Sequence, residues 1–238
     1  MRLDKYLTKC FVGSRSDVKK YIKQKKVKVN DQIITSDSYN INEFEDIVIY
    51  DNQIITFKEH YYFILNKPAG YISSTTDPIN KTIIELFKDL PVLLQKELFP
   101  VGRLDKDTEG LLIVTNDGEF AHKLTSPNTN IQKKYYFEYD GTLINDAINI
   151  VEEGMKTQNE TFRPGILEPI NDKSCYLTIS EGKYHQVKKM THELGVVLTY
   201  LKRVQISSIK LPNELEVGKY VEVDEEIIKK QAFNELIR

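Results

Sequence analysis

The sequence predicts an α+β protein with two domains, residues 1–57 and residues 58–238. Three observations predict this class. The first thirty residues combine two short helical patterns with a local excess of positive charge. The rest of the chain mixes short β-branched or aromatic runs with amphipathic segments of helical spacing. At 238 residues the chain is long enough for one sizeable core and one small additional module.

The composition is that of an ordinary globular chain, with 40% hydrophobic and 29% charged residues. No run approaches the roughly eighteen apolar residues of a membrane span, and the charged start MRLDKYLTKC has no apolar signal core. Cys10 and Cys175 are the only cysteines, so neither a disulfide framework nor a zinc cluster is indicated. We therefore expect a cytoplasmic protein with reduced, structural cysteines and without a membrane partner.

The first domain opens with the pattern of two helices and a hairpin. Apolar residues share one helical face within 3–7 and again within 18–22, and Ser14 or Ser16 can cap the second helix. Strand-forming residues then flank Asn30-Asp31, a pair typical of tight turns.

The same segment is strongly basic. Residues 1–30 hold ten lysines and arginines against two aspartates. Lys19, Lys20 and Lys23 lie on the helical face opposite the apolar one, and Arg15 precedes them. Such a surface suits RNA phosphates, and a merely solvated lysine face is the alternative.

The second domain is organised around the stretch VGRLDKDTEGLLIVTNDG, residues 101–118. The unbroken apolar run 111–115 predicts a strand buried on both faces. Asn116-Asp117-Gly118 predicts a sharp turn after the strand, because these residues tolerate positive φ. The polar loop 102–110 comes before the strand, so its side chains are delivered to the end of a rigid element.

The chemistry of this loop is left open by its spacing alone. Asp105, Asp107 and Glu109 alternate, which is compatible with an oxygen-ligated metal site or with a solvated acidic turn. A third interpretation is one carboxylate that acts as a nucleophile or base while Arg103 keeps it ionised.

The remaining patterns place further elements along the second domain. Strands are predicted at 61–65, 133–139, 175–179 and 220–223, and helices at 83–87, 120–124, 147–151, 187–194 and in a final segment through Ile237. Gly154 and Gly195 are predicted to end the helices that precede them. The turn Lys67-Pro68-Ala69-Gly70 is interpreted as a structural corner, and Pro91 as a stop before the linker to the central strand.

Several of these motifs resemble one family. GRLD followed by Thr108, Gly110 and LLIVTNDG resembles the signature of pseudouridine synthases, specifically the RsuA branch, which acts on ribosomal RNA. NKPAG, KKY and EGKYHQVKKM resemble further motifs of the same family, and residues 1–30 resemble the S4 RNA-binding module. The resemblance covers nearly the whole chain. It implies a small S4-like domain followed by a catalytic domain with a twisted, mostly antiparallel sheet.

The resemblance also implies roles for individual residues. Asp105 would be the catalytic aspartate, Tyr135 the ring that stacks on the target base, and Lys188 the cation that pairs with Asp105. Asp107 and Glu109 fall at positions that the family does not use for chemistry. RNA contacts are expected from Arg103, Arg15, Lys19, Lys20, Lys23, Lys183 and Gln186. Leu201 and Arg203 resemble the element that packs under the active site, and Ser207 stands where the family commonly has glycine.

The implied reaction is the isomerisation of one flipped-out uridine in RNA to pseudouridine, without cofactor or metal. The HQV form of the EGKYHQVKKM motif is typical of the branch that modifies 16S ribosomal RNA, and the resemblance implies uridine-516 as the target. The substrate would be ribosomal RNA or a small-subunit assembly intermediate. The enzyme is expected to be a monomer. Three alternatives remain open: a synthase acting on 23S ribosomal RNA or transfer RNA, a non-catalytic S4-type assembly factor, and a magnesium-dependent nuclease or hydrolase that uses the three carboxylates of the polar loop.

Overall fold

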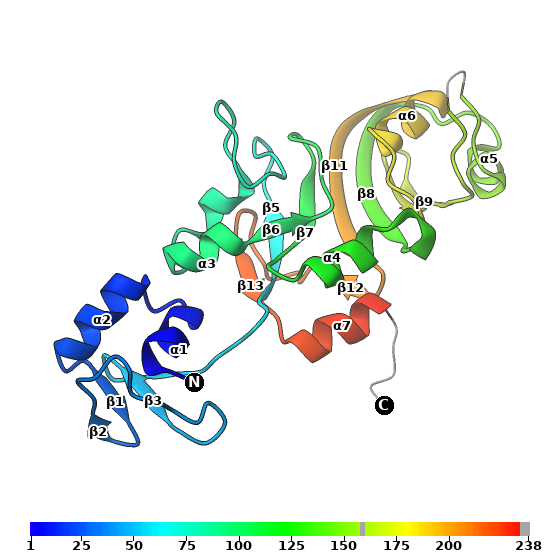
Figure 1. Cartoon of the computed structure of the whole chain (residues 1–238). Coiled ribbons are helices and arrows are strands. Elements are labelled where there is room, and N and C mark those ends of the chain that lie inside the picture. Colours follow the sequence, from blue (N-terminus) through cyan, green and yellow to red (C-terminus); the bar gives the residue numbers. More distant parts are fainter. Residues whose placement is uncertain (158–159, 234–238) are drawn as a thin grey trace. The chain divides into compact units, whose positions relative to one another are not determined.

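The computed structural model describes residues 1–157 and 160–233, and the chain folds into two compact units (Figure 1). One unit comprises Met1–His60 and Phe87–Glu97, and the other comprises Tyr61–Leu86 and Leu98–Arg238. These units are defined by contacts within the fold, and the domain boundary between residues 57 and 58 stays a prediction.

The first unit builds one core from two helices and a small sheet. Helices α1 (Leu3–Lys9) and α2 (Arg15–Lys23) precede the antiparallel sheet β2-β1-β3-β4, whose strands are β1 (Val27–Val29), β2 (Gln32–Ile33), β3 (Val48–Tyr50) and β4 (Gln53–Ile55). Ser14 is the cap of α2, since its hydroxyl accepts from the Asp17 backbone N–H at 3.3 Å. Asn30 and Asp31 both have positive φ, so the predicted hairpin turn is confirmed. Helix α3 (Val92–Glu97) starts directly after Pro91 and was not predicted.

The second unit is built on one nine-stranded sheet. Its main path runs β13-β5-β7-β11-β8-β10-β9, with β6 paired to β7 and β12 to β11 (Figure 1). The strands are β5 (Tyr62–Lys67), β6 (Phe99–Val101), β7 (Glu109–Thr115), β8 (Lys133–Gly141), β9 (Ile166–Asn171), β10 (Ser174–Ile179), β11 (Val196–Ile206), β12 (Ile209–Lys210) and β13 (Tyr220–Glu222). Among these strands only β7 and β11 pair in parallel, so the mostly antiparallel sheet is confirmed for the described residues.

The helices follow the predicted pattern. They are a 3-10 turn (Ile83–Phe87), α4 (Gly118–Thr125), a second 3-10 turn (Pro127–Thr129), α5 (Ala147–Glu153), α6 (Gln186–Glu193) and α7 (Glu225–Phe233). The predicted final helix is present as α7, and its expected continuation to Ile237 lies outside the described residues. Gly154 and Gly195, the predicted helix stops, both adopt positive φ directly after α5 and after the last turn of α6.

Strand β7 lies inside the sheet between β5 and β11 and is buried on both faces, as predicted. On one face Leu111 and Ile113 pack in a cluster with residues of α4 and α7. The predicted positive-φ turn after β7 is wrong, because Asp117 has φ −90° and caps α4, accepting from the Phe120 N–H at 2.9 Å. An aspartate that begins a helix needs no left-handed backbone.

Two backbone positions fix the ends of this central region. Gly110 has φ +100° where β7 pairs in parallel with β11, and a Cβ there would collide with the Arg203 carbonyl oxygen. The polar loop before β7 can therefore approach β11 closely only with glycine at this position. Ser207, after β11, also has positive φ, a conformation that glycine adopts most readily.

Candidate active site

The backbone of the loop that contains Asp105 is held by hydrogen bonds from a buried lysine. Lys67, at the end of β5, has no exposed surface, and its ammonium donates to the carbonyl oxygens of Asp105 at 3.0 Å and Thr108 at 2.8 Å. The carbonyl of Pro68 lies at 3.1 Å and that of Lys106 at 3.4 Å. Burial lowers the pKa of Lys67 to about 8, against the opposing effect of the nearby carboxylates.

Further contacts fix the backbone of the same loop. The Gly70 N–H donates to the Lys106 carbonyl at 2.7 Å. The Ser73 hydroxyl donates to the Leu104 carbonyl and accepts from the Leu104 N–H, both at 3.0 Å. The segment from the end of β5 to Ser73 therefore forms a rigid support that orients Asp105 before any substrate arrives.

Two cationic or ionisable groups from the region of α6 face the Asp105 carboxylate. The Lys188 ammonium lies 3.3 Å from Oδ2, and His185 Nε2 lies 3.5 Å from Oδ1. His185 precedes α6 with positive φ, a conformation that turns the chain toward the loop. The sequence did not indicate His185, because no local pattern shows which way the ring of a turn residue faces.

Lys188 is shared between two carboxylates rather than reserved for Asp105. Its ammonium donates to Asp107 Oδ1 at 2.7 Å and to Oδ2 at 2.8 Å, which are shorter than its distance to Asp105. Burial opposes both charges, yet their hydrogen bond prevails, so the pKa of Lys188 is raised and that of Asp107 is lowered. Asp107 therefore takes part in the charge balance at Asp105, although the family resemblance implied no chemical role for it.

One small cavity collects most of the predicted site residues. Its volume is about 80 Å³. Among its lining residues are Arg103, Asp105, Tyr135, Lys183, Gln186 and Lys188. Asp105 and Lys188 also face a larger, open hollow of about 900 Å³, which gives the carboxylate access to solvent. Residues from the polar loop, from β8 and from α6 are thus brought together around one carboxylate.

Tyr135 differs from its aromatic neighbours in β8. Phe137 and Tyr139 are buried in the core, and the Tyr136 hydroxyl donates to Glu138 on the exposed side. Tyr135 is also largely buried, but it lines the small cavity with Asp105. A ring in that position can support a planar base.

Lys183 and Gln186 are occupied by contacts within the protein. The Lys183 ammonium donates to the Thr161 carbonyl at 2.6 Å. The buried Gln186 amide accepts from the Lys183 N–H at 3.0 Å and donates to Glu181 at 2.9 Å. Their observed contacts hold the turn before α6, and their contact with RNA stays a prediction.

The carboxylates of the polar loop are not arranged around a common metal position. The Tyr200 hydroxyl donates to Glu109 at 2.7 Å, and Lys188 lies between Asp105 and Asp107. Within the described residues, no group of three or more acidic, histidine or cysteine side chains is placed to hold a metal ion. A lysine organises this loop, which leaves the metal-dependent nuclease without support from these contacts.

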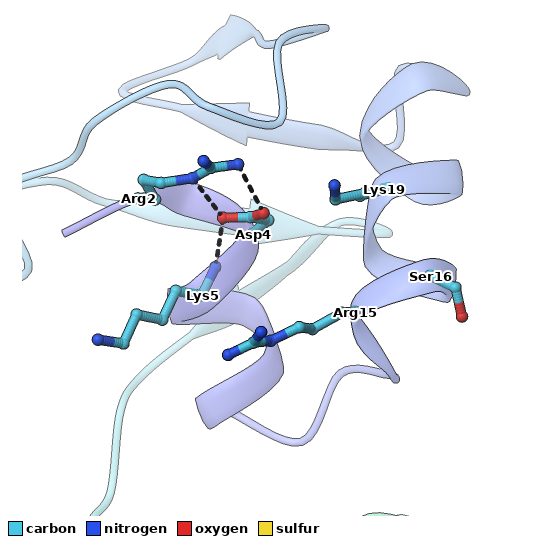
Figure 2. Close-up of a pocket in the computed structure, with 6 residues that line it drawn as sticks. All are labelled: Arg2, Asp4, Lys5, Arg15, Ser16 and Lys19. Atoms are coloured by element: carbon cyan, nitrogen blue, oxygen red, sulfur yellow. Dashed lines mark hydrogen bonds and ion pairs between the residues drawn. The ribbon is translucent and has the colours of Figure 1, made fainter.

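The first unit carries a separate basic hollow of about 510 Å³ (Figure 2). It is lined by Arg2, Asp4, Lys5, Arg15, Ser16 and Lys19. Of the four predicted contacts on α2, Arg15 and Lys19 line it, whereas Lys20 and Lys23 do not. The sequence missed Arg2 and Lys5, because only the charged face of the second helix was considered.

Acidic partners neutralise part of this basic hollow. Arg2 donates to both carboxylate oxygens of Asp4, at 3.1 and 2.9 Å (Figure 2). Lys19 lies 3.2 Å from Asp37. The Arg15 guanidinium and the Lys5 ammonium extend toward the same side of the hollow in Figure 2, so they are the best placed to meet a phosphate.

Comparisons with known proteins agree with this architecture. A family model described as RNA pseudouridylate synthase matches residues 61–193, and an S4 domain model matches residues 1–48. The chain is 36% identical over 232 residues to ribosomal small subunit pseudouridine synthase A of Haemophilus influenzae, covering 97% of this chain and 99% of the relative. It is 35% identical over 230 residues to the protein of that name in Escherichia coli K12, covering 96% and 98%.

A solved structure extends the likeness to three dimensions. A crystal structure described as a pseudouridylate synthase matches with a TM-score of 0.68 and 35% identity, covering 97% of this chain and 99% of that one. No helix within the described residues is long and apolar enough to cross a membrane. The predicted S4 module, catalytic domain and enzyme class are confirmed, and the chain belongs to the RNA pseudouridine synthase family, whose members isomerise uridine in RNA.

Proposed function

We propose that this protein converts one uridine of small-subunit ribosomal RNA to pseudouridine, with uridine-516 of 16S RNA as the target. The relatives named ribosomal small subunit pseudouridine synthase A, which match over nearly the full length, support the substrate class. The observation that carries the chemistry is the single cavity shared by Asp105, Tyr135 and Lys188. An enzyme with this substrate acts where ribosomes are assembled, which in a bacterium is the cytoplasm.

In this proposal Asp105 starts the reaction as an ionised carboxylate. The Lys188 ammonium lies 3.3 Å from this carboxylate, and the hydrogen bonds from Lys67 to the loop backbone fix the position of Asp105. Asp105 attacks the ribose or the uracil ring, and either route breaks the bond between ribose C1′ and uracil N1. The uracil turns within the site and rejoins ribose C1′ through C5, and the bond to Asp105 breaks, which restores the free carboxylate. N1 gains a proton and C5 loses one, so the product is an isomer of the substrate.

Tyr135 supplies the surface on which the uracil lies during this rotation. A base that leaves its stack in RNA loses its neighbours, and an aromatic side chain replaces one of them for roughly 1–3 kcal/mol. The ring of Tyr135 is itself packed in the sheet, so it presents a fixed plane to the cavity.

Selection of one uridine requires contacts beyond the base. A cavity for a single uracil accepts every uridine equally, whereas phosphate contacts set where the protein sits on a folded RNA. We assign this docking role to the basic hollow of the first unit, through Arg15, Lys5 and Lys19.

The decisive experiment is Asp105→Asn in the full chain. The substrate is transcribed small-subunit ribosomal RNA carrying tritium at uridine C5, so that each turnover releases label. We expect the variant to fold and to bind RNA like the wild type but to release no tritium. Near-normal release by the variant would overturn the assignment of Asp105.

Two further readouts separate the alternatives. Pseudouridine has the same mass as uridine, so the modified position is mapped by base-specific chemical derivatisation. This mapping would also reveal a 23S ribosomal RNA or transfer RNA target. A chelator should leave the activity intact, whereas a magnesium-dependent enzyme would lose it. A non-catalytic assembly factor would bind the RNA and produce no pseudouridine.

A further inference from the structure

A second cavity of about 430 Å³ lies beside the small cavity of the active site in the catalytic unit. The two share Arg103, Tyr135 and Lys183 as a common wall, but Asp105 does not line the second one. The charged side chains that line it are the cations Arg103, Lys133, Arg163, Lys183 and Arg203 and one carboxylate, Glu181. A cavity with this charge balance suits an anionic ligand.

Arg203 is a built-in part of this wall rather than a mobile surface group. It is 2% exposed, and its Nε donates to the Leu111 carbonyl at 2.8 Å. Its Nη2 is buried and has no hydrogen-bond partner among the described residues. A buried donor of this kind is unfavourable unless it gains an acceptor. Arg203 therefore contributes a fixed positive charge to the cavity wall.

Lys133 adds a second cation, and no carboxylate of residues 1–157 or 160–233 forms an ion pair with it. Its ammonium donates to the Ile131 carbonyl at 3.2 Å. Burial and the nearby Arg203 charge lower the pKa of Lys133 to about 8, with Glu181 acting in the opposite direction. An anion placed beside this ammonium would raise the pKa of Lys133 again, because it favours the charged form of the lysine.

Glu181 does not neutralise the group. Its Oε1 accepts from Gln186 and from the Arg163 backbone N–H, both at 2.9 Å, and its Oε2 lies 3.9 Å from Lys183. The Arg163 guanidinium donates to the neutral Asn130 side chain at 2.6 Å. The cavity is thus lined by five cations and one carboxylate, and the shortest hydrogen bonds to Glu181 come from two uncharged donors, the Gln186 amide and the Arg163 backbone N–H.

We propose that this second cavity binds a backbone phosphate of the RNA strand, next to the target uridine. The inference rests on the proposed function, because Tyr135 supports the target base from the wall that the two cavities share. Arginine and lysine are the side chains that hold phosphate oxygens, arginine in a fixed two-pronged geometry. Val101, Leu124 and Ile206 line the same cavity and give an apolar surface for the sugar or base attached to that phosphate.

The test compares two neighbouring lysines in the full chain. Lys133→Met removes a cation from the cavity. Lys134→Met removes the next residue's charge, which lies 2.6 Å from Glu168 and does not line the cavity. Affinity for transcribed small-subunit ribosomal RNA is measured across a potassium chloride series. We expect the slope of log affinity against log salt to fall by about 0.7–0.9 for Lys133→Met and to stay at the wild-type value for Lys134→Met.

A second variant protects the test against misfolding. Arg163→Gln changes an exposed side chain at the rim, and circular dichroism verifies the fold of each variant. If Lys133→Met does not fold, Arg163→Gln must show the same fall in slope. Equal slopes for the folded cavity variants, the control and the wild type would overturn the proposal.

A free phosphate compound is the other source of the same ligand chemistry. Inorganic phosphate is therefore added to each protein and the shift in melting temperature recorded. If phosphate stabilises the wild type but not the cavity variants while RNA slopes remain equal, the strand-binding proposal is overturned in favour of a small ligand. Pseudouridine formation by the wild type is scored separately, so failure of the reaction and failure of the phosphate site are told apart.

Discussion

Lys67→Met tests whether a buried ammonium holds the polar loop, which contains Asp105, in place. The substitution keeps most of the side-chain volume and removes the donor that serves the carbonyls of Pro68, Asp105 and Thr108 at 2.8–3.1 Å. Each carbonyl left without a donor costs roughly 1–3 kcal/mol, and removing a charge from the interior offsets part of that sum. We expect the free energy of unfolding to fall by about 3 kcal/mol.

The effect on catalysis should exceed the effect on stability. A displacement of Asp105 by about 1 Å is enough to lower turnover roughly 100-fold. Urea unfolding gives the free energy, and single-turnover tritium release under conditions where the variant is folded gives the rate. Lys210→Met, in which an exposed lysine of β12 loses its charge, is the matched control. If Lys67→Met unfolds and turns over like this control, the loop does not depend on Lys67.

Three further predictions use the same assays. Lys188→Met should lower turnover strongly because it leaves Asp105 and Asp107 near each other without their shared cation, whereas Asp107→Asn should retain most activity. If Asp107→Asn loses more activity than Lys188→Met, Lys188 is not the residue that supports Asp105. Arg15→Gln should lower the salt slope of RNA binding by about 0.7–0.9, whereas Lys20→Gln, outside the basic hollow, should not, and equal slopes would remove the docking role. The pKa of Lys67 is lowered from 10.5 to about 8, so the unfolded chain holds the extra proton between these values and wild-type stability should rise from pH 8 to 10 relative to Lys67→Met. Parallel pH profiles of the two proteins would show that the shift is absent.

Part of the order of elements was predictable because periodicity and turn residues are local properties, whereas strands β6, β9, β11 and β12 were not predicted. The buried run of β7, the hairpin at Asn30-Asp31 and the helix stop at Gly154 all depend on a few neighbouring side chains. Helix α3 was missed because a proline can end one segment and also begin the next helix. Likewise, a positive-φ turn was predicted where Asp117 instead caps a helix.

The site was predictable only where a family motif marks it. The proximity of Lys188 to Asp105 follows the motif, but the division of that lysine between two carboxylates depends on distances across the fold. Lys67 looked like part of an ordinary corner, since sequence does not show that its ammonium is buried under a loop some forty residues later. The side of the turn on which His185 lies is set in the same way by tertiary packing.

The parallel pairing of β7 with β11 has a consequence for the size of substrate that the enzyme accepts. In β11, Arg203 pairs with Gly110 of β7 on one side and with Tyr135 of β8 on the other. One strand therefore separates the strand that follows the Asp105 loop from the strand that carries Tyr135. Backbone hydrogen bonding sets each step at about 4.8 Å, so this backbone separation is about 10 Å whatever side chains β11 carries. Mutations can change the chemistry of the cavity wall, but its width is determined by main-chain geometry.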